Sequence, residues 1–156
     1  MVVETQEHAV ASPGFYLRTR PTGFAVHINA SAAHLRRVRE LAEKTLYEAG
    51  VDPGISETVL LVASELIGNS VRACGDHVPL VVEVDAGQAG VSVRVHDPEP
   101  GRLPRRRPVA LDDAEAESGR GLGLIDLLAP GWQVRSTPVG KQIVCSLPYT
   151  EGDGGA

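Results

Sequence analysis

A glutamate and an asparagine, four residues apart, interrupt an apolar run near the middle of the sequence. Glu65 and Asn69 follow the apolar residues 59–63, and on an α-helix their spacing places both side chains on one face, one turn apart. Because the preceding run is apolar on nearly every side, we expect this helix to be buried. An unpaired neutral polar group there costs roughly 2–7 kcal/mol. The pair is therefore either a site for a cation, water or ligand, or a buried pair bonded to neighbouring backbone.

A second carboxylate, Asp97, ends a stretch in which apolar and polar residues alternate. Residues 91–97 and the similar stretch 80–85 flank a short turn, which predicts an antiparallel hairpin. If the valines of residues 91–97 point into the core, Asp97 points the same way and requires a hydrogen-bond donor. The alternative is an aspartate that caps the following turn.

Glycines alternate with other residues just before a short apolar helical stretch. Such a segment lets backbone N–H groups approach an anion closely, and the helix N-terminus favours negative charge, so phosphate is the natural ligand. A dinucleotide-binding fingerprint would need a strand directly before it, and a P-loop would need Lys and Ser or Thr after it, where this chain has Leu124. The residues concerned are Gly119, Arg120, Gly121, Leu122 and Gly123.

The connection over about residues 98–118 shows no clear period. It carries a basic patch and then an acidic one, and the basic residues are Arg102, Arg105, Arg106 and Arg107. A long irregular connection inside a domain is usually a functional lid or a flexible segment. The arginines are expected to touch phosphates, a partner's acidic face or only water.

Other elements must hold these residues in place. Alternation predicts a strand over residues 24–29, and helical spacing predicts a helix from the N-cap Ser31 to Gly50. The central helix begins at Asp52-Pro53 or at Ser56 and ends near Gly75. Two final strands are expected over residues 132–137 and 141–147.

Composition limits the possible classes of protein. A chain of 156 residues is long enough for one domain with its own core. The net charge of -5 argues against broad nucleic-acid binding. Cys74 and Cys145 provide no disulfide framework, and metal binding through Cys74 and His77 is not expected. Without an apolar stretch of membrane-spanning length or a signal peptide, we expect a cytoplasmic protein.

The ordered set of motifs resembles the GHKL ATPase superfamily of gyrase, MutL, heat-shock chaperones and histidine kinases. The resemblance is nearest to the small bacterial anti-sigma-factor serine kinases and their relatives, and it covers roughly residues 22–148. It implies an ATP-binding domain there, with a lid at about 98–118, an N-terminal arm over residues 1–21 and a disordered tail over residues 149–156. The expected fold is an α/β (α+β) two-layer sandwich of the Bergerat type, a mostly antiparallel mixed sheet packed against helices.

The resemblance also implies roles for the residues. Asn69 would help to hold Mg²⁺, Glu65 would orient or deprotonate the attacking hydroxyl, and Asp97 would accept a hydrogen bond from the adenine amino group. The lid and phosphate contacts would come from Gly101, Gly119, Arg120, Gly121, Leu122 and Gly123.

The chain departs from the family pattern at several positions. In place of Asp-x-Gly-x-Gly it has Asp97-Pro98-Glu99-Pro100-Gly101. Ser70 follows the asparagine where relatives usually have Ala, and Ala73 stands where they have His. In the last hairpin we match Gln142 to a threonine that often supports adenine binding.

Three functions remain open on the sequence. The first is a protein serine kinase that binds ATP and Mg²⁺, binds a sigma factor and phosphorylates an antagonist of the anti-sigma factor. The second is a binding module that uses ATP only to choose between partners, and the third is a structural protein without nucleotide. No nucleic-acid or membrane partner is expected, and a homodimer is left open.

Overall fold

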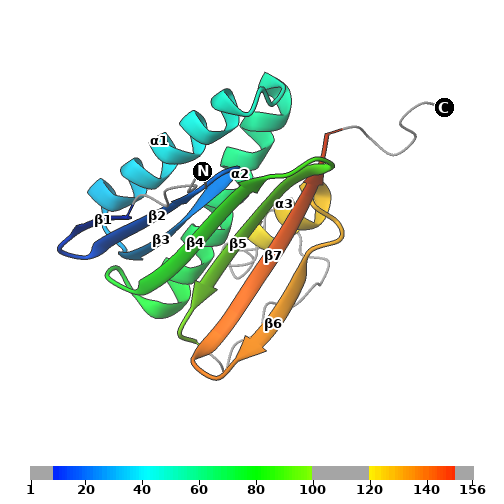
Figure 1. The fold of residues 1–156 in the computed structure, drawn as a ribbon. Coiled ribbons are helices and arrows are strands. Elements are labelled where there is room, and N and C mark those ends of the chain that lie inside the picture. Colours follow the sequence, from blue (N-terminus) through cyan, green and yellow to red (C-terminus); the bar gives the residue numbers. More distant parts are fainter. Residues whose placement is uncertain (1–8, 100–119, 150–156) are drawn as a thin grey trace.

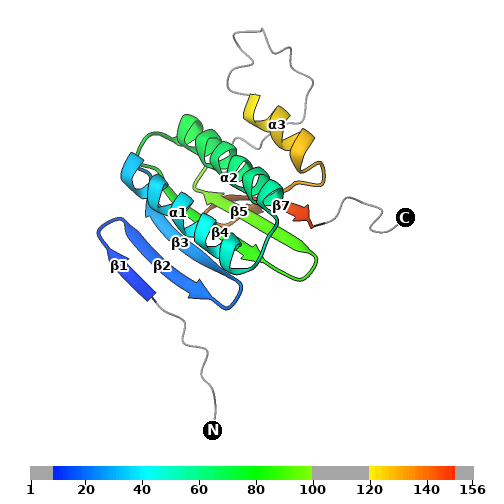
Figure 2. The same cartoon turned by 90° about the horizontal axis from the view of Figure 1, so that it is seen from above.

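In the part of the chain that the structure describes, seven strands form one sheet and three helices cover one of its faces (Figures 1 and 2). The computed structural model describes residues 9–99 and 120–149. The strand order is β1-β2-β3-β4-β5-β7-β6. The bounds are β1 Ala9–Ser12, β2 Phe15–Arg20, β3 Gly23–Asn29, α1 Ala32–Glu48, α2 Pro53–Cys74, β4 Pro79–Ala86, β5 Gly90–Asp97, α3 Arg120–Leu128, β6 Gln133–Thr137 and β7 Gly140–Pro148.

The predicted α+β two-layer sandwich is confirmed. Every pairing between neighbouring described strands is antiparallel, whereas the sequence led us to expect a mostly antiparallel mixed sheet. Even β5 and β7, which are separated by the long connection and α3, run antiparallel. None of the described helices has the length and apolar character needed to cross a bilayer.

Local sequence signals determine where the two long helices begin. Ser31 caps α1, since its Oγ accepts a hydrogen bond from the backbone N–H of His34 at 3.1 Å. Asp52 caps α2 by accepting from the N–H of Gly54 at 3.0 Å, and Pro53 occupies the first turn. The earlier of the two predicted starts of α2 is therefore confirmed.

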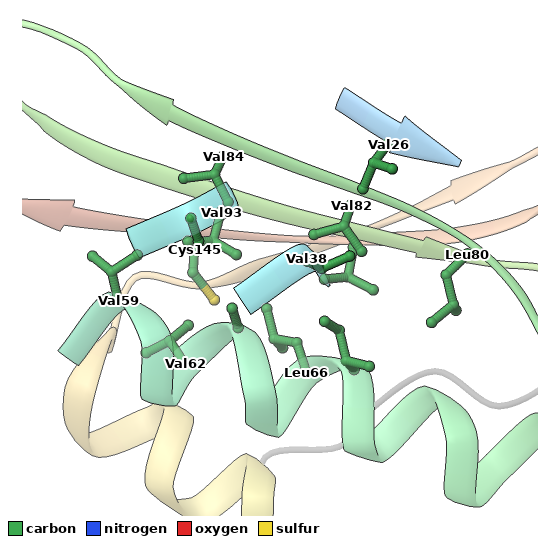
Figure 3. Close-up of a cluster of buried hydrophobic side chains, with 14 of the residues drawn as sticks. Val26, Val38, Val59, Val62, Leu66, Leu80, Val82, Val84, Val93 and Cys145 are labelled. Carbon is green, nitrogen blue, oxygen red and sulfur yellow. The ribbon is translucent and has the colours of Figure 1, made fainter. Parts of the chain in front are cut away.

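The core lies between the helices and the covered face of the sheet (Figure 3). On α2, Val59, Val62 and Leu66 repeat at helical spacing and have no exposed surface. They face the inward valines of the alternating strands and Cys145 of β7. Burial raises the pKa of the Cys145 thiol to about 11, so this cysteine stays protonated at neutral pH.

The segment expected to be an N-terminal arm contributes two strands to the sheet. β1 and β2 form a hairpin, and β2 pairs with β3 along its full length. Phe15 and Leu17 of β2 are buried in the core, and the guanidinium of Arg37 lies 3.6 Å from the centroid of the Phe15 ring. Of the predicted arm, residues 1–8 lie outside the described part of the chain, as does the tail from residue 150.

Gly140, at the start of β7, lies directly against the end of β5. Its φ of 147° is rarely adopted by other residues. A Cβ at this position would overlap the carbonyl oxygen of Asp97. The absence of a side chain at residue 140 therefore lets β7 pair with β5 beside Asp97.

We expect Gly140→Ala to lower the free energy of unfolding by at least about 2 kcal/mol, because the backbone strain adds to the steric overlap. Urea denaturation measures the change. Gly87→Ala is the matched control, since a Cβ there would meet its nearest neighbour, the Gly90 oxygen, at an ordinary 3.6 Å. Equal stabilities for the two variants would contradict the close approach.

Candidate functional site

Asp97 is a buried carboxylate at the end of β5, with only 2% of its surface exposed. As the alternation predicts, it shares the inward side of β5 with the buried valines. Three donors among the described residues reach it: the Ser70 hydroxyl at 2.6 Å, the Lys141 ammonium at 2.8 Å and the backbone N–H of Glu99 at 3.0 Å. Asp97 thus has the donors that its burial requires, and it also caps the turn that follows it.

Lys141 of β7 forms a buried ion pair with Asp97. The two residues lie directly opposite each other in the β5–β7 ladder, and their side chains are 5% and 3% exposed. The ammonium also donates to the carbonyl oxygen of Glu99 at 3.2 Å. Taking two charges out of water is costly, so the attraction and the extra hydrogen bonds must offset that desolvation.

Our match of Gln142 to the adenine-supporting threonine is wrong, because Gln142 does not lie beside Asp97. It pairs with His96 in the ladder, so it projects from the opposite face of the sheet, where it donates to Glu83 at 3.4 Å. Lys141 occupies the position beside Asp97 instead. The alternation of β7 could have predicted that Lys141 points inward, because Lys141 has the same parity as the buried Ile143, Cys145 and Leu147.

Ser70 connects the central helix to the same carboxylate. Its Oγ donates to Oδ2 of Asp97, and the residue is 3% exposed on α2. The sequence marks Ser70 as a departure from the alanine of relatives without assigning it a function. The structure shows that the hydroxyl is a donor to Asp97, which an alanine at this position could not supply.

Asn69 and Glu65 lie on α2 one turn apart, as predicted. Oδ1 of Asn69 accepts from the guanidinium of Arg72, while Nδ2 is buried and has no hydrogen-bond partner among the described residues. Glu65 is half-buried, and its carboxylate makes no hydrogen bond or ion pair within residues 9–99 and 120–149. The alternative in which both side chains bond to neighbouring backbone is not what the structure shows.

These side chains fit a nucleotide with its metal ion. The unpartnered Nδ2 of Asn69 is a donor suited to a phosphate oxygen, because a buried amide without a partner is costly. Oδ1 of Asn69 is an oxygen ligand of the kind that Mg²⁺ prefers, once the exposed Arg72 moves away from it. No group of three or more His, Cys, Asp or Glu able to hold a metal occurs among the described residues.

Helix α3 begins within the glycine-rich segment, and it lies beside α2 (Figure 2). Its backbone includes Arg120, Gly121 and Leu122 in the first turn. A Cβ added at Gly123 would meet no atom within 4 Å, so packing against described residues does not explain this glycine. Gly101, Gly119 and the arginines between residues 102 and 107 lie outside the described residues, as does nearly all of the predicted lid.

The fold and these side chains define a class: an antiparallel α+β domain whose central helix carries Glu65 and Asn69 and contacts a buried carboxylate on the sheet through Ser70. The chain matches the family of histidine kinase-like ATPase domains over residues 28–147, more than half of its length, and it belongs to that family. No curated protein matches the chain. Membership supports the GHKL resemblance and the binding of ATP.

Proposed function

We propose that the chain is an ATP-dependent protein serine kinase of the anti-sigma-factor type, which phosphorylates an antagonist protein. The observation that carries the proposal is the arrangement of Glu65 and Asn69 on α2, which itself contacts Asp97 through Ser70. ATP binding is supported by the family. The partners, a sigma factor and the antagonist of the anti-sigma factor, rest on the resemblance alone.

In this mechanism Asp97 accepts a hydrogen bond from the adenine amino group. The phosphates lie toward the N-terminus of α3, whose backbone N–H groups favour anions. A serine hydroxyl of the antagonist attacks the γ-phosphorus, the bond to the oxygen of the leaving ADP breaks, and the proton passes to the carboxylate of Glu65. Mg²⁺ would neutralise charge on the phosphates, and among the described residues Asn69 would hold it.

A second candidate function is a nucleotide-dependent binding module with little or no catalysis. The observation that favours it is the crowding of Asp97, which already accepts from Ser70, Lys141 and the N–H of Glu99. In addition, Glu99 replaces the first glycine of the family motif. A partner-binding protein would tolerate the slower nucleotide turnover that these changes favour.

Titration of the protein with a non-hydrolysable ATP analogue, with and without Mg²⁺, tests the site that both functions share. We expect Mg²⁺-dependent binding, and we expect Asp97→Asn to raise the Kd by roughly 10- to 150-fold, because a hydrogen bond to a charged group contributes about 1.5–3 kcal/mol. Asp85→Asn is the matched control. Asp85 lies on β4 beside the buried Val84 and so projects from the uncovered face of the sheet.

Circular dichroism must show that both variants are folded before their affinities are compared. Absence of binding at millimolar nucleotide would contradict the ATP site. An unchanged affinity in folded Asp97→Asn would mean that the adenine amino group is bound elsewhere.

A further inference from the structure

Two departures from the family pattern meet at the same carboxylate. Ser70 replaces the usual alanine, Lys141 takes the place expected for threonine, and both donate to Asp97. Because Asp97 is the proposed acceptor for the base, its partners bear on how the base is recognised. The inference drawn from them rests on the proposed function.

The Lys141 ammonium has bonding capacity left over. It carries three N–H donors, of which one points to Asp97 and one to the carbonyl oxygen of Glu99. Within the described parts of the chain no acceptor takes the third. The Lys141 side chain is only 5% exposed, so a ligand atom that accepted this N–H would meet a largely desolvated donor.

The carboxylate of Asp97 also has capacity left. A carboxylate offers about four acceptor positions, and three donors among the described residues reach Asp97: two on Oδ1 and Ser70 on Oδ2. One acceptor position therefore remains on Oδ2. The Lys141 ammonium lies 2.8 Å from Oδ1 of the same carboxylate. The remaining donor and acceptor therefore belong to two groups in direct contact, as the recognition of adjacent polar atoms on one base edge requires.

We propose that Lys141 is a specificity-determining residue of the nucleotide site and donates a hydrogen bond to the ring nitrogen N1 of adenine, while Asp97 accepts from the neighbouring 6-amino group. On its Watson–Crick edge, adenine presents the 6-amino donor beside the N1 acceptor. The Asp97–Lys141 pair presents the complementary acceptor and donor. A base without an acceptor at position 1 leaves the buried N–H of Lys141 unpaired, which weakens its binding.

The structural alternative is that Lys141 only neutralises the charge of Asp97. In that case the loss of Lys141 would disturb Asp97 and weaken the binding of every adenine nucleotide by the same factor. If Lys141 recognises N1, the effect of losing Lys141 depends on whether the ligand has this one atom. A ligand that lacks this atom therefore separates the two roles.

The probe is 1-deaza-ATP, in which a C–H group replaces N1. Calorimetric titration of the wild-type protein should show ATP binding roughly 10- to 150-fold more tightly than 1-deaza-ATP. Lys141→Met, which has a similar shape but no donor, should bind the two nucleotides with equal affinity. The matched control Lys44→Met changes an exposed lysine of α1 and should keep the wild-type preference.

Equal affinities of the wild-type protein for the two nucleotides would overturn the inference, as would a full preference retained in Lys141→Met. If Lys141→Met does not fold, Lys141→Gln, which keeps a neutral donor, replaces it and should show a reduced preference. A wild-type protein that binds neither nucleotide overturns the proposed function and this inference together. Binding of ATP without preference overturns only the inference.

Discussion

Lys141→Met is expected to lower the free energy of unfolding by about 3–5 kcal/mol, because removing one partner of a buried ion pair leaves the other charge buried and uncompensated. Asp97 would keep the donors Ser70 and the N–H of Glu99 but lose its counter-charge. Urea denaturation without nucleotide measures the change. Bound ATP must be absent, since a ligand stabilises the folded state by mass action.

Lys44→Met is again the matched control, because the Lys44–Glu48 pair on α1 has side chains that are 72% and 63% exposed. Pairs as exposed as this contribute little, and we expect a change within about 1 kcal/mol. The double variant Asp97→Asn with Lys141→Met removes both charges, so it should recover part of the loss. Equal stabilities for Lys141→Met and Lys44→Met would show that the buried pair does not stabilise the fold.

The periodicity of the sequence predicts the frame around the site. The start of α2 follows from Asp52 and Pro53, which supply a side-chain acceptor and a fixed first turn. The inward direction of the Asp97 side chain follows from its parity with the valines of β5. Both signals are local, and local signals can be derived from the order of residues alone.

The partners of Asp97 depend on contacts between distant parts of the chain. Lys141 is 44 residues away from Asp97 in sequence, and a shift of one residue in the register would place Gln142 there instead. The match to Gln142 makes this error. Applied to β7, the parity argument that places Asp97 inward also places Lys141 inward, but it does not say which residue of β5 lies opposite.

Ser70 shows a different limit. Helical spacing places it on α2 next to Asn69, yet only the packing of α2 on β5 brings its hydroxyl within 2.6 Å of Asp97. Likewise, the sequence predicts Asn69 to be polar and buried, but not that Arg72 takes its oxygen and leaves its nitrogen without a partner among the described residues. These details depend on side-chain packing, which residue order does not specify.

Glu65→Gln is expected to abolish phosphoryl transfer while leaving nucleotide binding intact. The glutamine keeps the shape of the side chain but cannot take the proton of the attacking hydroxyl, and loss of a general base lowers kcat by roughly 10²- to 10⁴-fold. The Kd for ATP should stay within about twofold, because in the proposed mechanism Glu65 acts on the attacking hydroxyl rather than on the base. With Mg²⁺ and no antagonist, release of labelled phosphate measures turnover with water in place of the serine hydroxyl, and calorimetry measures binding.

Glu57→Gln is the matched control, since Glu57 is an exposed glutamate about two turns earlier on α2. It should leave both turnover and binding unchanged. Wild-type turnover in Glu65→Gln would refute the assignment of Glu65 as the base. A wild-type protein that binds ATP but transfers no phosphate to water or protein would instead favour the nucleotide-dependent binding module, and Glu65→Gln would then change neither measurement.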